Sequence, residues 1–206
     1  MASVGLCQWA PLIVGAACVA PLAFVLVCKP SLGLGVLPLI KPKDLVEATI
    51  VVTAFVVLCF AVQPLWVFSW LEALKGGQHI LPVAYSPLGW IPALALLRWR
   101  DPRAMLILTL ACIPQNPGVS HTLALIFVAS TWQQSATLAL GQHVAWLVGL
   151  TLIETHTFDQ WGHYARALDL VFIYLPAVVI LMADKDRGYF SQGRTCESRN
   201  QNTKGR

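Results

Sequence analysis

The sequence predicts an all-α membrane protein, a polytopic transmembrane helical bundle with about five full spans and a broken or re-entrant helical hairpin at residues 104–130. Two observations support this class. Of the 206 residues, 57% are hydrophobic and only 12% are charged, about half the charged share of a soluble domain. The apolar residues also gather in runs of about 20, the length that a helix needs to cross a bilayer. A soluble domain of this length has no core large enough for them.

The first half of the chain predicts three spans. Lys29 ends the first apolar run, and a charged stretch at residues 41–47 precedes the second. Trp66 and Trp70 close the second run, because aromatic rings favour the membrane–water interface. Three prolines in the third run predict a kink or a late start. The runs cover residues 10–28, 48–71 and 80–97.

The fourth apolar region is divided by a turn. Residues 104–113 and 122–129 are apolar, and the sequence PQNPGVSH lies between them at residues 114–121. Two prolines and a glycine so close together do not hold a continuous helix. We predict either a helical hairpin that dips into the membrane or two tilted spans that meet at a tight turn. Non-helical backbone at this depth must be covered by protein or line a wet cavity.

The C-terminal part predicts two further spans and a tail. Residues 136–153 and 167–183 are apolar, and a polar loop over residues 154–166 joins them. A membrane domain therefore covers residues 1–183. Residues 184–206 are hydrophilic and basic, which predicts a disordered cytoplasmic tail.

Basic residues predict the orientation, because loops rich in Lys and Arg stay in the cytoplasm. There are none before the first span, three before the second, one before the third and three before the fourth region. This alternation predicts an external N-terminus. The six basic residues of the tail lie inside only if residues 104–130 go into the membrane and return. We therefore predict a multi-pass plasma-membrane protein with a cytoplasmic C-terminus, whose partner is the lipid bilayer and not a nucleic acid.

The polar loop at residues 154–166 carries the candidates for catalysis. Carboxylates and imidazoles can form an acid–base pair or bind a metal. The spacing does not match the HExxH signature, and the six cysteines form no CxxC pair. We therefore predict no metal site and no cofactor, and the loop is alternatively a solvated connection. The candidates are Glu154, His156, Asp159 and His163.

Other polar residues are candidates for substrate binding. Broken membrane helices often build sites from their ends, so the turn at residues 114–121 is either such a site or a plain connection. Polar residues inside a membrane are functional candidates, and Gln142-His143 are either that or a hydrogen-bonded helix contact. We interpret Asp169, one turn into its span, as facing headgroups. The candidates are Lys29, His79, Gln115, Asn116, His121 and His143.

Three motifs in order carry a family resemblance. Lys29-Pro30-Ser31 is followed by LGLGVLP, and the sequences ALALLRWRDPRA and LACIPQ begin at residues 93 and 110. They resemble the KPQ-type element, the arginine-rich loop and the proline turn of glycosyltransferase family 87, a family of GT-C membrane enzymes. The resemblance runs from about residue 20 to 183 and matches the C-terminal half of the family. It implies a polyprenyl-phosphate sugar as the donor substrate and hexosyl transfer as the reaction.

The sequence departs from this family at several points. Ser31 replaces Gln, and Ser120-His121 stands where a Tyr-Asp or His-Tyr pair is frequent. GT-C enzymes carry a catalytic acidic residue in a first outer loop of an N-terminal half, and nothing before residue 10 supplies it here. The resemblance therefore implies a truncated, lipid-carrier half that is not catalytic alone.

Three functions stay open. The first is the lipid-carrier half of a GT-C glycosyltransferase, with Lys29 and the arginines at 98, 100 and 103 on anionic groups. The predicted orientation puts these arginines inside, whereas GT-C transfer occurs outside, so we interpret them as orientation charges. The second is a non-enzymatic partner of a second membrane subunit, with an exposed apolar seam. The third is a small channel or transporter that uses the PQNP turn and a wet path past His143.

Overall fold

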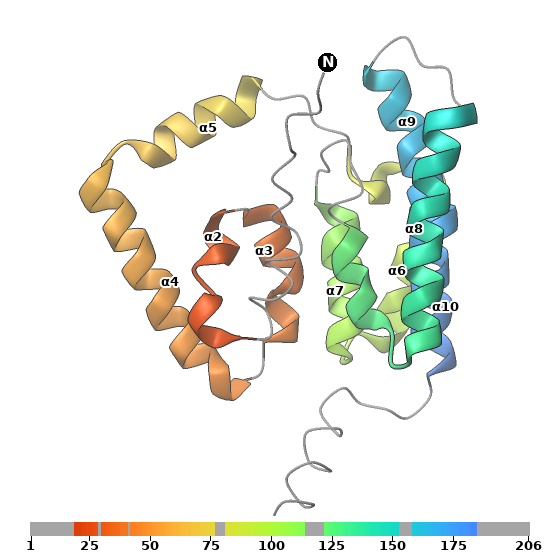
Figure 1. The fold of residues 1–206 in the computed structure, drawn as a ribbon, viewed down its shortest axis with the longest axis horizontal. Coiled ribbons are helices and arrows are strands. Elements are labelled where there is room, and N and C mark those ends of the chain that lie inside the picture. The colour runs from red at the N-terminus through yellow and green to blue at the C-terminus, as the bar shows by residue number, and fades with distance from the viewer. Residues whose placement is uncertain are drawn as a thin grey trace, which may run out of the picture.

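The computed structural model describes residues 19–28, 30–40, 42–76, 81–113, 122–152 and 158–184. Every regular element in these segments is helical, which confirms the all-α class (Figure 1). The α-helices are α2 (Val25–Cys28), α3 (Pro30–Val36), α4 (Pro42–Val62), α5 (Trp66–Gly76), α6 (Trp90–Ala93), α7 (Pro102–Cys112), α8 (Trp132–Leu152), α9 (Phe158–Asp169) and α10 (Leu175–Ala183). Tighter 3-10 turns cover Ala20–Leu22, Leu37–Leu39, Val83–Tyr85, Leu94–Arg98 and Thr122–Val128.

Two described segments are long and apolar enough to cross a membrane, Asp44–Val62 in α4 and Gln160–Ala183 from α9 to α10. The prediction of about five full spans is thus confirmed only as an apolar, helical architecture. The run at 80–97 is divided by its prolines into short turns and α6. Helix α8 has 21 residues but also contains polar residues such as Gln142 and His143. Most of the predicted first span lies outside the described residues.

The second apolar run, predicted as one segment over residues 48–71, is two helices. Helix α4 ends at Val62 and α5 begins at Trp66. Pro64 lacks an N–H and its ring prevents a helix from continuing through it. The turn is closed by the Gln63 N–H on the Cys59 carbonyl and by the Trp66 N–H on the Gln63 carbonyl.

The last helix begins earlier than the sequence predicts. Residues 158–166, assigned to a polar loop, form most of α9, which continues through a π-helical turn at Leu170–Tyr174 into α10. Asp169 therefore lies near the middle of the candidate span Gln160–Ala183, not one turn into it. In the π-turn the Leu175 N–H bonds to the Leu170 carbonyl five residues earlier. Pro176 explains the irregularity, because it cannot donate to the Phe172 carbonyl four residues before it.

The chain reverses direction within the fourth apolar region, residues 104–129. Helix α7 ends at Cys112 with Ile113 extended, so residues 104–129 are not one straight helix. The 3-10 segment Thr122–Val128 packs against α7. Arg103, at the start of α7, donates from Nη1 to the Val128 carbonyl at 3.4 Å. The two ends of the region are therefore neighbours, as the predicted hairpin requires; the turn at 114–121 lies outside the described residues.

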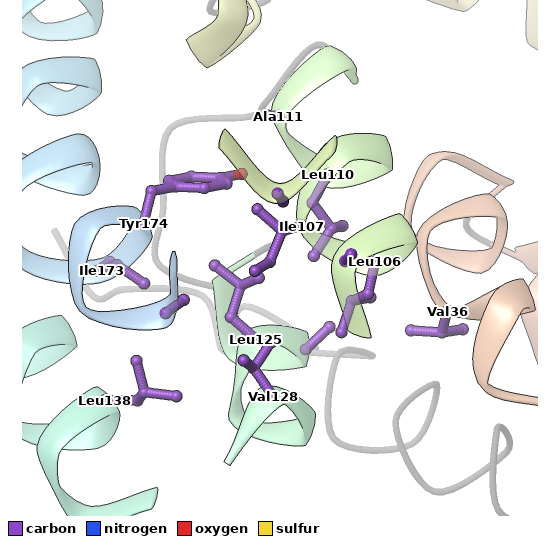
Figure 2. Packing of buried hydrophobic residues seen from close by; sticks show 14 of the residues in the cluster. Val36, Leu106, Ile107, Leu110, Ala111, Leu125, Val128, Leu138, Ile173 and Tyr174 are labelled. Atoms are coloured by element: carbon purple, nitrogen blue, oxygen red, sulfur yellow. The ribbon is translucent and has the colours of Figure 1, made fainter. Parts of the chain in front are cut away.

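The buried core lies between α7, the Thr122–Val128 segment and the last helix. Figure 2 shows Ile107 and Leu110 of α7, Leu125 of the returning segment and Tyr174 of the π-turn gathered in one buried cluster. All four side chains are almost fully buried. These contacts hold α7, the returning segment and the last helix together.

Candidate functional site

The most developed polar site surrounds Arg103, whose side chain is 2% exposed. Its Nε donates to both carboxylate oxygens of Asp101 at 3.1 Å, and its Nη2 donates to Asp101 at 2.8 Å. Its Nη1 donates to Asp184 at 2.8 Å and to the Ser130 hydroxyl at 2.9 Å. One guanidinium thus joins the start of α7, the residues before α8 and the end of α10. We call Asp101, Arg103, Ser130 and Asp184, together with Arg98, the arginine cluster.

The sequence Asp101-Pro102-Arg103 builds the first side of the cluster. The Asp101 carboxylate accepts the Arg103 backbone N–H at 2.9 Å and so caps α7. Pro102 fits the first helical position, where its missing N–H has no helical partner in any case. The same carboxylate therefore begins the helix and holds the arginine side chain.

The second side of the cluster is the C-terminal end of α10. Arg98 donates from Nη1 to the Leu181 carbonyl at 2.7 Å and to the Asp184 carbonyl at 2.6 Å. The last carbonyls of a helix have no partner within it, so a cation here satisfies them and meets the negative end of the helix dipole. Ser130 also donates its hydroxyl to the Asp184 carboxylate. The two arginines therefore fix the end of the last helix.

The charges of the cluster are balanced within it. Burial alone would lower the pKa of Arg103, but hydrogen bonds and charge attraction from Asp101 and Asp184 outweigh burial and raise that pKa above its ordinary value. Arg103 therefore stays charged across the physiological pH range. Its donors are directed to carboxylates, a hydroxyl and a carbonyl, so the arrangement suits a structural clamp better than a binding site for an external phosphate.

The remaining arginine of this loop has a different environment. Arg100 is exposed, and its guanidinium lies 5.1 Å from the centre of the Trp99 ring in a cation–π contact. Of the three arginines interpreted as orientation charges, two therefore also have a structural role. Ser130 and Asp184 were not among the sequence candidates; a carboxylate directly after the last apolar run was the available signal.

A second polar contact lies inside the bundle. Gln142 of α8 is 8% exposed and donates from Nε2 to the Thr122 hydroxyl at 2.9 Å. This contact agrees with the interpretation of Gln142 as a hydrogen-bonded helix contact. His143 is exposed, and its Nδ1 lies 2.7 Å from the Ala139 carbonyl oxygen of the same helix. The structure thus gives the two neighbours different environments, Gln142 buried and His143 exposed.

Small residues on α8 allow the last helix to approach closely. A Cβ on Gly141 would lie 2.1 Å from the Phe172 carbonyl oxygen, and a Cβ on Gly149 would lie 2.7 Å from the Trp161 ring. Ala145, midway between the two glycines, is buried. The spacing Gly141-Ala145-Gly149 is the small-xxx-small pattern of membrane helix contacts, a sequence signal absent from the candidates above.

The catalytic and binding candidates are only partly described. His163 is exposed on α9, where its ring stacks on Tyr164 with 6.0 Å between the centroids. Asp159 belongs to the first turn of α9. Within the described segments, no three His, Cys, Asp or Glu residues group closely enough to hold a metal. The candidates that lie outside the described residues are Lys29, His79, Gln115, Asn116, His121, Glu154 and His156.

Comparison with family models, curated proteins and solved structures gives no match. The resemblance to glycosyltransferase family 87 therefore stays a prediction from the motifs.

Proposed function

We propose that this chain is an integral membrane protein without enzyme activity of its own that packs beside a second membrane subunit. The observation that supports this proposal is the exposure of α4. Its apolar stretch Asp44–Val62 has a mean hydropathy of 2.5, yet only 6% of it is buried within the chain. Ile50, Val57 and Leu58 are about 60% exposed. A helix that is apolar on all sides needs lipid or another protein around it.

Contacts to the rest of the chain occupy little of α4. It packs on the Ala20–Leu22 turn and on α2, and the Phe24 and Phe55 rings lie 5.4 Å apart. In Figure 1, α4 lies at the edge of the fold, away from α8 and α10. The arginine cluster supports a non-enzymatic role as well, because its charges are used to hold the fold together.

Photo-crosslinking tests the partner role. We expect a photoreactive residue at Val57, exposed on α4, to form one discrete protein adduct in native membranes. The same residue at the buried position Ala48 is the control and should form none. Adducts to lipid alone at Val57 would contradict the partner role. Sugar transfer from a polyprenyl-phosphate donor that is lost in Glu154→Gln or Asp159→Asn would contradict the non-enzymatic part and support the GT-C hypothesis.

We also propose a multi-pass arrangement in the plasma membrane, with the N-terminus outside and the C-terminus inside. The arginine cluster supports it, because Arg98 and Arg103 lie beside Asp184, where the basic tail begins. In sealed, right-side-out vesicles an impermeant maleimide should label a single cysteine at Cys7. A single cysteine at Cys196 should react only after detergent is added. Labelling of Cys196 in intact vesicles would show that the orientation is wrong.

A further inference from the structure

We propose that α5 is an interfacial helix that lies flat on the outer leaflet, with its apolar side in the boundary between headgroups and acyl chains. The partner is the lipid surface itself. The inference rests on the proposed membrane position of α4, because α5 follows that helix after a three-residue turn, Gln63 to Leu65.

The length of α4 places this turn at the membrane surface. Its apolar stretch has 19 residues, and at 1.5 Å per residue such a helix is about 28 Å long, close to the hydrocarbon thickness of a bilayer. Pro64 then prevents the helix from continuing. In Figure 1, α5 runs away from the axis of α4 beyond this turn. A helix that starts here and changes direction has the interface available to it.

The residues of α5 suit such a position. At helical spacing, positions 66, 67 and 71 share one side and carry Trp, Val and Leu. Ser69, Glu72 and Lys75 share the other side, where Phe68 also lies. Tryptophan is enriched at headgroup level, where its ring meets apolar chains and its N–H meets polar groups. This division of side chains is the pattern of helices that lie on a membrane rather than cross it.

On the apolar side of α5, Leu71 is exposed and Trp66 and Val67 are half-buried, so this side is partly open to such a partner. Phe68 is 66% exposed and Leu71 is 43% exposed. Since α5 is tethered to the end of a membrane-spanning helix, the lipid surface is the apolar phase within its immediate reach. Phe68 lies on the polar side of the helix, between Lys75 and Glu72 at helical spacing.

Depth-dependent quenching tests the inference on the full chain in liposomes. Bimane is attached to one introduced cysteine at a time, with the native cysteines replaced by serine, and nitroxide lipids carry the quencher near the headgroup or near the chain end. We expect a nitroxide near the headgroup to quench Val67→Cys and Leu71→Cys strongly and Ser69→Cys and Glu72→Cys weakly. Val57→Cys, in the middle of α4, reports on the span and should be quenched by the deep nitroxide.

The outcomes distinguish failure of the α5 inference from failure of the α4 span. Deep quenching at Val57 with no quenching along α5 would place α5 in water and overturn the inference, while the span would stand. Deep quenching at all four α5 positions would make α5 a continuation of the span and also overturn it. Loss of quenching at Val57 would remove the span and, with it, both proposals.

Discussion

Replacing Arg103 with Met should destabilise the protein by about 3–5 kcal/mol, because one partner of a buried ion-pair network is removed and the others stay. The Asp101 and Asp184 carboxylates, 16% and 13% exposed, would lose the charge that balances them. The Ser130 hydroxyl and the Val128 carbonyl would lose a donor as well. The free energy of unfolding of the purified protein in mixed micelles, followed by tryptophan fluorescence against denaturant, measures the effect.

Arg100→Met is the matched control. It removes the same side chain from the same loop, but Arg100 is exposed and contacts only the Trp99 ring among the contacts described above. We expect a loss of less than about 1 kcal/mol, the value of an exposed cation–π contact. Arg103→Lys should fall between the two variants, since an ammonium keeps the charge but cannot serve two carboxylates with a planar fork. Equal stability of R103M and R100M would show that the cluster is not a clamp.

The sequence predicted the class of fold because apolar runs report directly on helices in an apolar environment. It also predicted the return of residues 104–130 by counting basic residues, and the contact of Arg103 with Val128 agrees with that return. The boundaries of the helices were harder to predict. The start of the last helix was misassigned because α9 is amphipathic. A search for apolar runs therefore finds this helix only from residue 167 onward. That error also placed Asp169 too near the surface.

Neither apolar runs nor the count of basic residues could predict the arginine cluster. Arg103 and Asp184 are 81 residues apart, and no local spacing connects them. The three arginines of the loop have the same appearance in the sequence, although only two of them reach the end of α10 or its neighbours. Charge counting treats a buried arginine and an exposed one alike, because both contribute equally to orientation. Their difference comes from the tertiary packing of α7 against α10.

The contact between α8 and the last helix predicts a second large effect, at Gly141. A Cβ there would lie 2.1 Å from the Phe172 carbonyl oxygen, a backbone atom held within a helix. Gly141→Ala should therefore force the helices apart and cost about 1–3 kcal/mol, as overpacking of a tight contact does. This loss would appear although alanine favours a helix over glycine by about 1 kcal/mol. The unfolding measurement described for Arg103 applies here too.

Gly149→Ala is the control for this effect, because it brings the same gain in helix propensity eight residues along the same helix. Its added methyl group would meet the Trp161 ring at 2.7 Å, at the outer edge of a side chain that can turn. We expect G149A to cost clearly less than G141A. The reverse order would mean that the Trp161 ring, and not the Phe172 backbone, sets how closely the two helices approach.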